Sequence, residues 1–319
     1  MKDPVIAAGA AHAFLGAKDG PLRAYALDDG HQVWTKDIRT ALPPVVGEDL
    51  LFVVQDGELL ALDQSTGHER WHVSSGDMAR APLHQAGWLF FSAKDGSLVA
   101  LRSADGSEVW RQALGAPTAA AMSVDGDQLF APLTDGRLVS LAINAAGTQL
   151  WSCMLDSPGG SPLAAGDRVY LGSAKGLFYS VKEKNGRLDW QHKRIGTPVI
   201  GRPVLDGERV FIATLDSRVV AIDRGGGAQL WWEPLNARPV EQLTIESDHL
   251  LVPLTSGEIA IVSEKTGKSI APIAPPASSG VRLAAPMAVG GSAGALHLLR
   301  ITMGTDAVPV LESFTQQKK

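Results

Sequence analysis

The sequence is poor in several features that mark particular classes of protein. It has a single cysteine, Cys153, so no disulfide can form within the chain. It also has no apolar run of about 18 residues, the minimum for a helix that spans a membrane. Long basic stretches are missing as well, and the formal net charge is −5 at pH 7. Nucleic acid would therefore gain no electrostatic attraction to this chain, and we expect neither a nucleic-acid partner nor a transmembrane segment.

The first residues also lack a usable signal peptide, because Asp3 and Pro4 stand where an apolar segment should begin. A signal trimmed from the start of the chain, together with a lipid anchor, would leave the same sequence. Hydrophobic residues make up 45% of the chain and charged residues 20%. These values are typical of a folded globular protein rather than a disordered one.

Glycine, by contrast, is abundant, with 34 residues, and it recurs in pairs ten residues apart. In one unit the two glycines are 11 residues apart, and another has Ser217 in place of the first glycine. The first members of the pairs lie 37 to 41 residues apart, which divides the chain into eight similar units. The pairs are Gly20 and Gly30, Gly57 and Gly67, Gly96 and Gly106, Gly136 and Gly147, Gly176 and Gly186, Ser217 and Gly227, Gly257 and Gly267, and Gly294 and Gly304.

Tryptophan follows the second glycine by four residues in six of these units. A large flat ring at one repeat position is suited to packing between neighbouring units, where it buries about 150–250 Å² and its N–H finds a backbone acceptor. We therefore expect these residues to dock one unit against the next. They are Trp34, Trp71, Trp110, Trp151, Trp190 and Trp231.

Between the glycines, apolar runs of four to seven residues alternate with turn dipeptides such as Asp56-Gly57 and Thr66-Gly67. Short β-rich runs bounded by such turns indicate strands, and no window of the repeat keeps a helical period. Units of about 40 residues with four strands predict an all-β, eight-bladed β-propeller with four-stranded antiparallel blades. Seven blades is the alternative, because the eighth unit has Val308 at the tryptophan position. The expected single domain, 1–319, has units of roughly 1–36, 37–75, 76–114, 115–155, 156–195, 196–236, 237–275 and 276–319.

Residues 61–71, ALDQSTGHERW, resemble the repeat core of propellers built from pyrroloquinoline-quinone-type repeats, Ala-Leu-Asp-x-x-Thr-Gly-x-x-x-Trp. Ala221-Ile222-Asp223 with Gly227 and Trp231 follows it closely. The quinoprotein dehydrogenases of this family are described as using a disulfide between adjacent cysteines above the quinone, which a chain with only Cys153 cannot form. The chain is also far shorter than those enzymes. It is most similar to the non-catalytic, BamB-like branch.

That resemblance implies a non-catalytic protein-binding scaffold of the cell envelope, periplasmic or otherwise extracytoplasmic, folded as a monomeric ring. It implies other proteins as partners, including a component of outer-membrane β-barrel assembly, and no cofactor, metal or catalytic residue. Two other functions stay open. One is a ligand-binding or sensory propeller that holds a small anion at the channel mouth, and the other is a quinone-dependent dehydrogenase. A cytoplasmic location also stays open.

Two short motifs imitate enzyme signatures. His68-Glu69-Arg70-Trp71-His72 matches the HExxH zinc pattern, but it contains the repeat tryptophan and should lie on a strand. Residues four apart on a strand are about 13 Å apart, too far for two imidazoles to share a zinc ion. The segment 290–294, GGSAG, matches a nucleophile elbow, yet it contains the turn glycine of the repeat and is followed by a further apolar run rather than a helix.

Arginines recur in the segments that lead from each repeat tryptophan to the next unit. In a propeller these segments cross one face towards the channel, where guanidinium groups would favour carboxylates or another anionic surface. Trp232 directly follows a repeat tryptophan and should point to the opposite face of its strand, as an exposed aromatic anchor for a partner. The candidate residues for partner or anion binding are Arg39, Arg80, Arg202, Arg238, Arg282 and Trp232.

Overall fold

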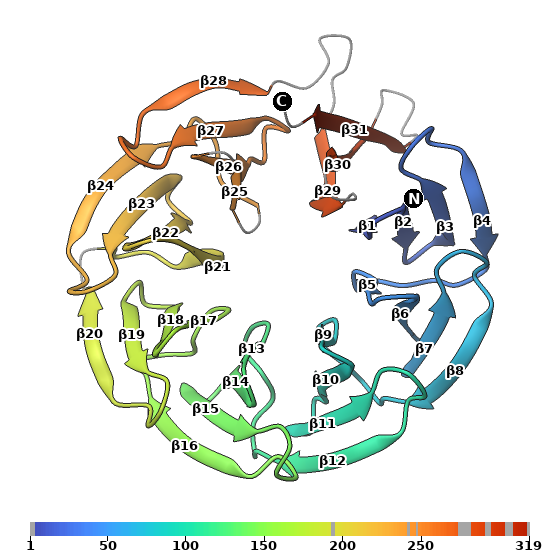
Figure 1. Cartoon of the computed structure of the whole chain (residues 1–319), viewed down its shortest axis with the longest axis horizontal. Coiled ribbons are helices and arrows are strands. Elements are labelled where there is room, and N and C mark those ends of the chain that lie inside the picture. Colours follow the sequence, from blue (N-terminus) through green and yellow to red (C-terminus); the bar gives the residue numbers. More distant parts are fainter. Residues whose placement is uncertain are drawn as a thin grey trace. The chain divides into compact units, whose positions relative to one another are not determined.

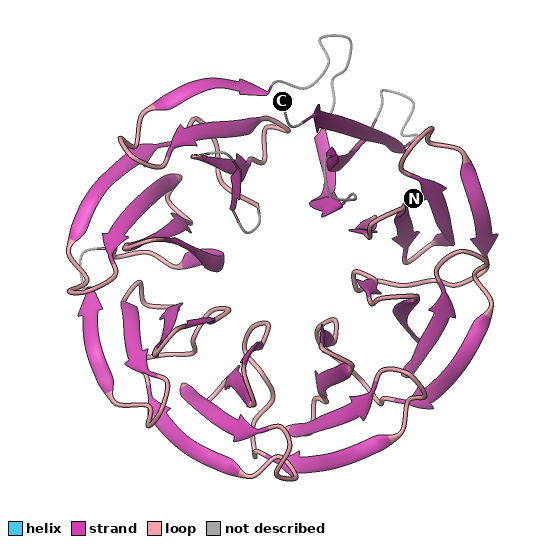
Figure 2. Cartoon of the chain, in the orientation of Figure 1, coloured by secondary structure: helices cyan, strands magenta, loops and turns pink. Residues whose placement is uncertain are grey.

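Every regular element in the described part of the chain is a β-strand (Figure 2). The computed structural model describes residues 4–192, 195–240, 243–246, 248–273, 282–290, 295–303 and 309–317. Gly294, Gly304 and Val308 of the eighth repeat unit lie outside these residues, as does the Gly-Ser-Ala-Gly part of the elbow-like motif. The contacts divide the chain into unit 1, with residues 1–94, 98–111 and 278–319, and unit 2, with residues 95–97 and 112–277. No helix of the described residues is long and apolar enough to cross a membrane.

The first three sheets belong largely to unit 1, and each is a four-stranded antiparallel meander in chain order. The first sheet has β1 (Val5–Ala8), β2 (His12–Ala17), β3 (Gly20–Ala26) and β4 (Gln32–Lys36). The second has β5 (Val45–Val46), β6 (Leu50–Gln55), β7 (Glu58–Asp63) and β8 (Glu69–Ser74). The third has β9 (Leu83–Gln85), β10 (Trp88–Ser92), β11 (Ser97–Arg102) and β12 (Glu108–Ala113).

Unit 2 repeats the same meander four times. The fourth sheet has β13 (Ser123–Asp125), β14 (Gln128–Pro132), β15 (Arg137–Ala142) and β16 (Gln149–Met154). The fifth has β17 (Leu163–Ala165), β18 (Arg168–Gly172), β19 (Phe178–Lys182) and β20 (Leu188–His192). The sixth has β21 (Val199–Asp206), β22 (Arg209–Thr214), β23 (Arg218–Asp223) and β24 (Gln229–Pro234). The seventh has β25 (Thr244–Glu246), β26 (His249–Pro253), β27 (Ile259–Ser263) and β28 (Ser269–Ile273).

The eighth repeat unit departs from this plan. Its described residues form a three-stranded antiparallel sheet of β29 (Arg282–Gly290), β30 (Ala295–Met303) and β31 (Pro309–Gln317). The described residues therefore form seven complete four-stranded blades, so the predicted count of eight gives way to the seven-blade alternative that the sequence left open. In unit 1, β29 lies beside β1, so the sheets at the two ends of the chain are neighbours (Figure 1).

The repeated glycines stand where the backbone takes a left-handed conformation. Gly57, between β6 and β7, has φ +82°, and Gly67, between β7 and β8, has φ +68°. A residue with a Cβ is strained at such angles, whereas glycine adopts them freely. The ten-residue spacing is thus the length of one strand with a tight turn at each end, which explains why the glycine pairs mark the blades.

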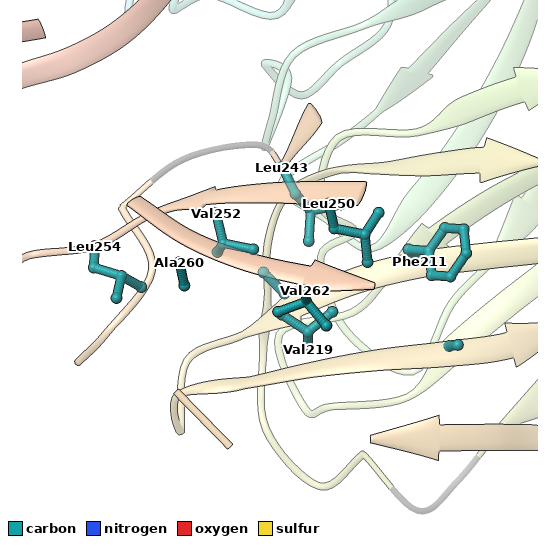
Figure 3. Packing of buried hydrophobic residues seen from close by; sticks show 10 residues of the cluster. Phe211, Val219, Leu243, Leu250, Val252, Leu254, Ala260 and Val262 are labelled. Carbon is teal, nitrogen blue, oxygen red and sulfur yellow. The ribbon is translucent and has the colours of Figure 1, made fainter. Parts of the chain in front are cut away.

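The core lies between neighbouring sheets, because the middle strands are buried on both faces. Phe211 and Ala213 of β22 pack against Leu250 and Val252 of the seventh sheet (Figure 3). Val210 and Ile212 alternate with them and pack instead against the fifth sheet, around Tyr170 and Phe178. Successive side chains of a strand point to opposite faces, so a strand between two sheets must be apolar at every position. This accounts for continuous runs such as Val210-Phe211-Ile212-Ala213.

Candidate functional site

The repeat tryptophans connect one sheet to the next through a backbone hydrogen bond. In Trp34, Trp71, Trp151, Trp190 and Trp231 the indole Nε1 donates to the carbonyl of the residue that follows the third strand of the next sheet. Because the acceptor is a main-chain oxygen, the side chain at that position is free to vary. The bonds run from Trp34 to Gln64 (2.8 Å), Trp71 to Ser103 (3.1 Å), Trp151 to Glu183 (2.6 Å), Trp190 to Arg224 (3.0 Å) and Trp231 to Glu264 (3.2 Å). Trp110 is buried and packs on Phe90, with ring centroids 5.9 Å apart.

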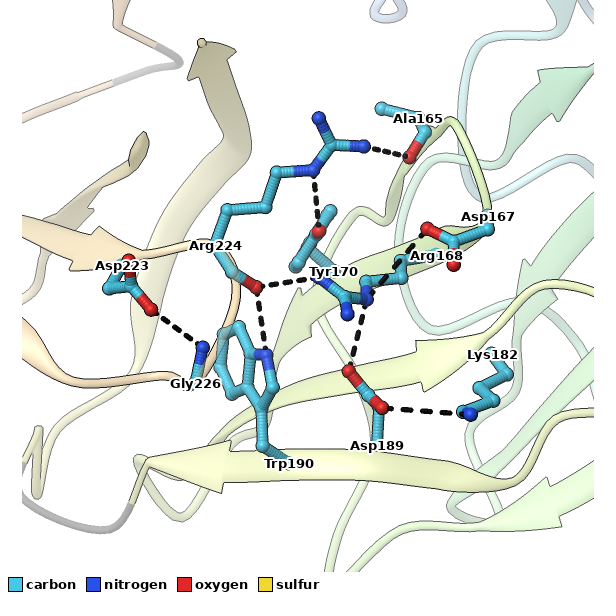
Figure 4. A network of polar contacts seen from close by, with 10 residues as sticks. All are labelled: Ala165, Asp167, Arg168, Tyr170, Lys182, Asp189, Trp190, Asp223, Arg224 and Gly226. Carbon is cyan, nitrogen blue, oxygen red and sulfur yellow. Dashed lines mark hydrogen bonds and ion pairs between the residues drawn. The ribbon is translucent and has the colours of Figure 1, made fainter. Parts of the chain in front are cut away.

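A second polar connection, which the sequence did not reveal, joins sheets of unit 2 (Figure 4). Arg168, the first residue of β18, donates from Nη1 to the carbonyl of Arg224 (2.9 Å), the same oxygen that accepts from Trp190. Its Nε lies 3.0 Å from Oδ2 of Asp189. Arg224 in turn donates to the hydroxyl of Tyr170 (3.2 Å). The fifth and sixth sheets are thus joined by hydrogen bonds from Arg168 and Arg224, while the ion pair of Arg168 with Asp189 lies within the fifth sheet.

The same strand position makes the equivalent contact in two other sheets. Gln128 donates to the carboxylate of Glu183 (3.2 Å), and Arg209 donates to the carbonyl of Glu264 (2.8 Å). The side chain of Glu264 is only 2% exposed. Burial raises the pKa of Glu264, and the nearby Asp206 carboxyl raises it further, while Arg209 acts in the opposite direction. These groups stabilise the fold and face a neighbouring sheet rather than a ligand.

Unit 1 contains a cavity of about 870 Å³, a volume that small ligands can fill. Its wall comes from the turns that join first to second and third to fourth strands in the first three sheets. Both signs of charge line it, with Glu48 and Asp63 beside Arg102. Hydrogen bonds from Ser65 and others lower the pKa of Asp63 to about 2, and burial lowers the pKa of His84 on the same wall.

The arginines predicted to bind a partner do not line this cavity. Arg39 follows β4 and Arg80 precedes β9, so both belong to the opposite strand ends of unit 1. Arg39 is exposed, with its Nε 3.7 Å from Asp37, and Arg80 is exposed as well. In unit 2, Arg238 is exposed and Arg202 is partly buried. The side chain of Arg282 lies outside the described part of the structure.

The zinc-like motif lies on a strand, as its position in the repeat predicted. Glu69 and His72 belong to β8, and His68 immediately precedes it. His72 Nδ1 is 2.7 Å from Glu69 Oε1, and this carboxylate raises the pKa of His72. The histidine is therefore paired with the glutamate of the motif, which in a zinc protease would serve as the general base instead.

One group of metal-binding residue types does come together in the described part of the chain, formed by Asp28, Asp29 and His31. All three are exposed in the turn between β3 and β4. His31 donates its backbone N–H to Asp29 Oδ1 (3.0 Å), and its ring Nδ1 lies 2.6 Å from the same oxygen. This is the hydrogen bonding of an aspartate-stabilised turn, and it accounts for the cluster without an ion.

Large apolar side chains reach solvent at one kind of position. Every one that is exposed among the described residues sits on a fourth strand, the last strand of its sheet. They are Val109 on β12, Leu150 and Met154 on β16, Leu188 on β20, Leu230 and Trp232 on β24, and Ile270 on β28. Of these, the sequence had singled out Trp232 alone.

On β24 the exposed apolar residues form a pair. Trp232 is 49% exposed, and Leu230 on the same strand is exposed to the same extent. Arg218 lies over the indole, with its guanidinium carbon 5.8 Å from the ring centroid of Trp232. Among the described strands β24 pairs only with β23, which leaves its other edge without a partner strand in this sheet. We call Leu230, Trp232 and this free edge the β24 surface.

A family model described as outer membrane protein assembly factor BamB matches residues 18–152 and 141–286. The chain belongs to the BamB family. The assembly factor BamB of Shewanella oneidensis is 23% identical over 273 residues, which cover 81% of this chain and 60% of the relative. That of Alteromonas naphthalenivorans is 27% identical, over 71% of this chain and 58% of the relative. The chain thus spans about three fifths of the length of these curated relatives.

Solved structures show the same fold. The crystal structure of BamB from Moraxella catarrhalis matches with a TM-score of 0.69 at 19% identity, over 81% of this chain and 85% of that one. A quinohemoprotein alcohol dehydrogenase from Pseudomonas putida matches with a TM-score of 0.71 at 13% identity, over 94% of this chain and 70% of that one. The chain is a β-propeller of pyrroloquinoline-quinone-type repeats, and within this fold it belongs to the BamB-like branch.

Proposed function

We propose that this chain is a non-catalytic, protein-binding scaffold of the cell envelope that acts in outer membrane protein assembly. The observation that carries the proposal is the match to the BamB family, which extends from residue 18 to residue 286. A polyvinylalcohol dehydrogenase also resembles the chain, but over only 34% of it and 18% of the enzyme. The proposed location is periplasmic, with a component of the outer membrane assembly machinery as the partner.

The β24 surface is our candidate contact for that partner. Tryptophan is enriched among residues that dominate binding energy, and Trp232 presents about half of its surface to solvent next to Leu230. Main-chain N–H and C=O groups stand in a row along the free edge of β24. An extended segment of the partner can pair with them as an added strand. A scaffold that binds in this way needs surface complementarity and no cofactor.

A crosslinking experiment in living cells tests both the partner and the surface. A photoreactive amino acid at Trp232 should capture a protein of the outer membrane assembly machinery. The matched control is the same amino acid at Thr35, an exposed position on the fourth strand of the first sheet. Capture of the same proteins at both positions, or capture of no assembly component at Trp232, would contradict the proposed contact.

Two further measurements address the function itself. Loss of the gene should lower the amount of β-barrel protein in the outer membrane, and the wild-type chain should restore it better than a Leu230→Ala, Trp232→Ala double variant. Alcohol oxidation coupled to a dye, measured with added quinone and calcium, should give no turnover above background. Saturable turnover would replace the scaffold with the dehydrogenase alternative.

A further inference from the structure

Arg202 stands on an irregular part of β21. Val199 pairs with Thr214 and Ile200 with Ala213, but the next pair is Val204 with Phe211. Three residues, 201–203, therefore oppose a single residue of β22. Gly201, the first of them, has φ +70°. Such a bulge interrupts the hydrogen-bond ladder and changes the direction in which a side chain projects, and bulges are over-represented beside functional sites.

The bulge directs Arg202 towards a distant part of unit 2. Its Nη2 donates to the carbonyl of Met122 at 3.0 Å. Met122 immediately precedes β13, the first strand of the fourth sheet, whereas β21 is the first strand of the sixth. The first strands β13, β17 and β21 follow one another side by side (Figure 1). The Arg202 side chain therefore runs along these first strands, from the sixth sheet past the fifth sheet to the fourth.

Several arginines of unit 2 have a carboxylate partner, and Arg202 has none among the described residues. Arg137 pairs with Asp135, Arg168 with Asp189 and Arg218 with Asp216. Burial lowers the pKa of Arg202, and no carboxylate of the described residues acts on it in the opposite direction. The Met122 carbonyl takes one of the five guanidinium N–H groups. A partly buried cation whose only described acceptor is a neutral carbonyl is favourable ground for an anion to accompany it.

We propose that Arg202 anchors an oxyanion site beside the first strands β13, β17 and β21 of unit 2, and that the ligand is a carboxylate. A carboxylate accepts two parallel hydrogen bonds from a guanidinium, which matches the donors that Met122 leaves available. The site is independent of the β24 surface and of the proposed assembly function. The carboxylate belongs either to a small metabolite or to an acidic side chain of a bound peptide, since both present the same group.

Nuclear magnetic resonance of the intact chain tests the site without any substitution. The arginine Nε–H signals are followed while citrate or a hexaglutamate peptide is added at constant ionic strength, with sodium chloride as the balancing salt. The Arg202 signal should shift saturably with at least one probe, and the Arg187 signal should not. Arg187 is an exposed arginine of the same unit and serves as the internal control.

Variants then assign the binding to the guanidinium. Arg202→Met should weaken binding of the active probe at least tenfold, Arg202→Lys should retain part of it, and Arg187→Met should leave it unchanged. If Arg202→Met does not fold, the proposal is decided by the shift of the Arg202 signal in the wild-type titration and by the binding of the probe to Arg202→Lys. Citrate alone as the active probe indicates a small metabolite, and the peptide alone indicates a protein ligand. No saturable shift with either probe, equal shifts at Arg187, or unchanged binding in Arg202→Met would overturn the proposal.

Discussion

Trp71 fills the space that a side chain on Gly106 would need: a Cβ built on Gly106 would lie 2.7 Å from Cε3 of the indole. The same relation joins Trp34 to Gly67, and it recurs in unit 2. At these positions the second glycine of the repeat therefore meets two requirements, a left-handed backbone in its own turn and room for the indole of the preceding sheet. The unit 2 pairs are Trp151 with Gly186, Trp190 with Gly227, and Trp231 with Gly267.

These two requirements can be separated by substitution. Gly30 stands at the same repeat position with φ +76°, but a Cβ there would meet nothing within 4 Å. Gly30→Ala should cost only the backbone strain, about 1–2 kcal/mol. Gly106→Ala should cost about 1–3 kcal/mol more, because the methyl group overlaps the indole of Trp71. Denaturant unfolding of both variants measures the difference, and equal losses would show that the indole moves aside freely.

The adjacent residues Trp231 and Trp232 should respond in opposite ways. Trp231 packs on Gly267 and donates to the Glu264 carbonyl, so Trp231→Ala should lower the free energy of unfolding by about 3–5 kcal/mol. Trp232 is half exposed, and Trp232→Ala should cost less than about 1 kcal/mol. Thermal unfolding of the two variants provides the comparison. A large loss in Trp232→Ala would assign that residue to the fold rather than to the β24 surface.

Gln64 should be intolerant of a negative charge. Its buried side chain donates from Nε2 to the carbonyls of Gly47 (3.0 Å), Glu48 (3.1 Å) and Leu50 (3.2 Å). In Gln64→Glu a carboxylate would face three carbonyl oxygens, so we expect a loss of at least about 1–3 kcal/mol at neutral pH. The new carboxyl should have a raised pKa in the folded state, so the loss should grow as pH rises above about 4.3.

Unfolding at pH 4 and pH 7 measures this pH dependence. Gln32→Glu, at an exposed position on β4, is the matched control and should change stability little at either pH. A Gln64→Glu variant that is as stable as this control at pH 7 would contradict the role given to the three carbonyl contacts.

Glu264 should make the wild-type protein less stable as pH rises. Its pKa is raised in the folded state by burial and by Asp206, so the unfolded chain loses this proton at lower pH than the native one. Stability is then unaffected below about pH 4.3, the ordinary glutamate value, and falls as pH rises through the raised pKa. Glu264→Gln carries no charge and should remove this fall. Glu208→Gln, at an exposed position of the sixth sheet, is the control and should keep it.

Chemical denaturation from pH 4 to pH 8 gives the required profiles. The free energy of unfolding of Glu264→Gln, relative to that of wild type, should increase as pH rises. A difference that stays constant across this range would show that Glu264 titrates as it does in the unfolded chain.

Much of the fold could be read from the glycine and tryptophan spacing. The spacing indicated four strands in each unit because a tight turn that needs a positive φ marks both ends of a strand, as at Gly57 and Gly67. The eighth unit was the exception. Its glycine spacing resembles that of the others, yet its described residues form a three-stranded sheet, so the count of eight complete blades was wrong.

The candidate sites were much less visible in the sequence. Arg202 was grouped with four other arginines because all stand in equivalent connecting segments. Only the structure shows that a bulge in β21 sets it apart and carries it to Met122. The cavity wall of unit 1 comes from turns of three successive sheets, which no local pattern brings together.

The sequence by itself determined the strands, their turns and the family, since these depend on local backbone preferences repeated along the chain. Tertiary structure alone decided which charges are paired and which are left with one neutral acceptor. The physical reason is that a strand position specifies the face on which a side chain emerges, whereas the contacts of Arg168 with Asp189, Arg209 with Glu264 and Arg202 with Met122 join residues about 20 to 80 positions apart in the chain.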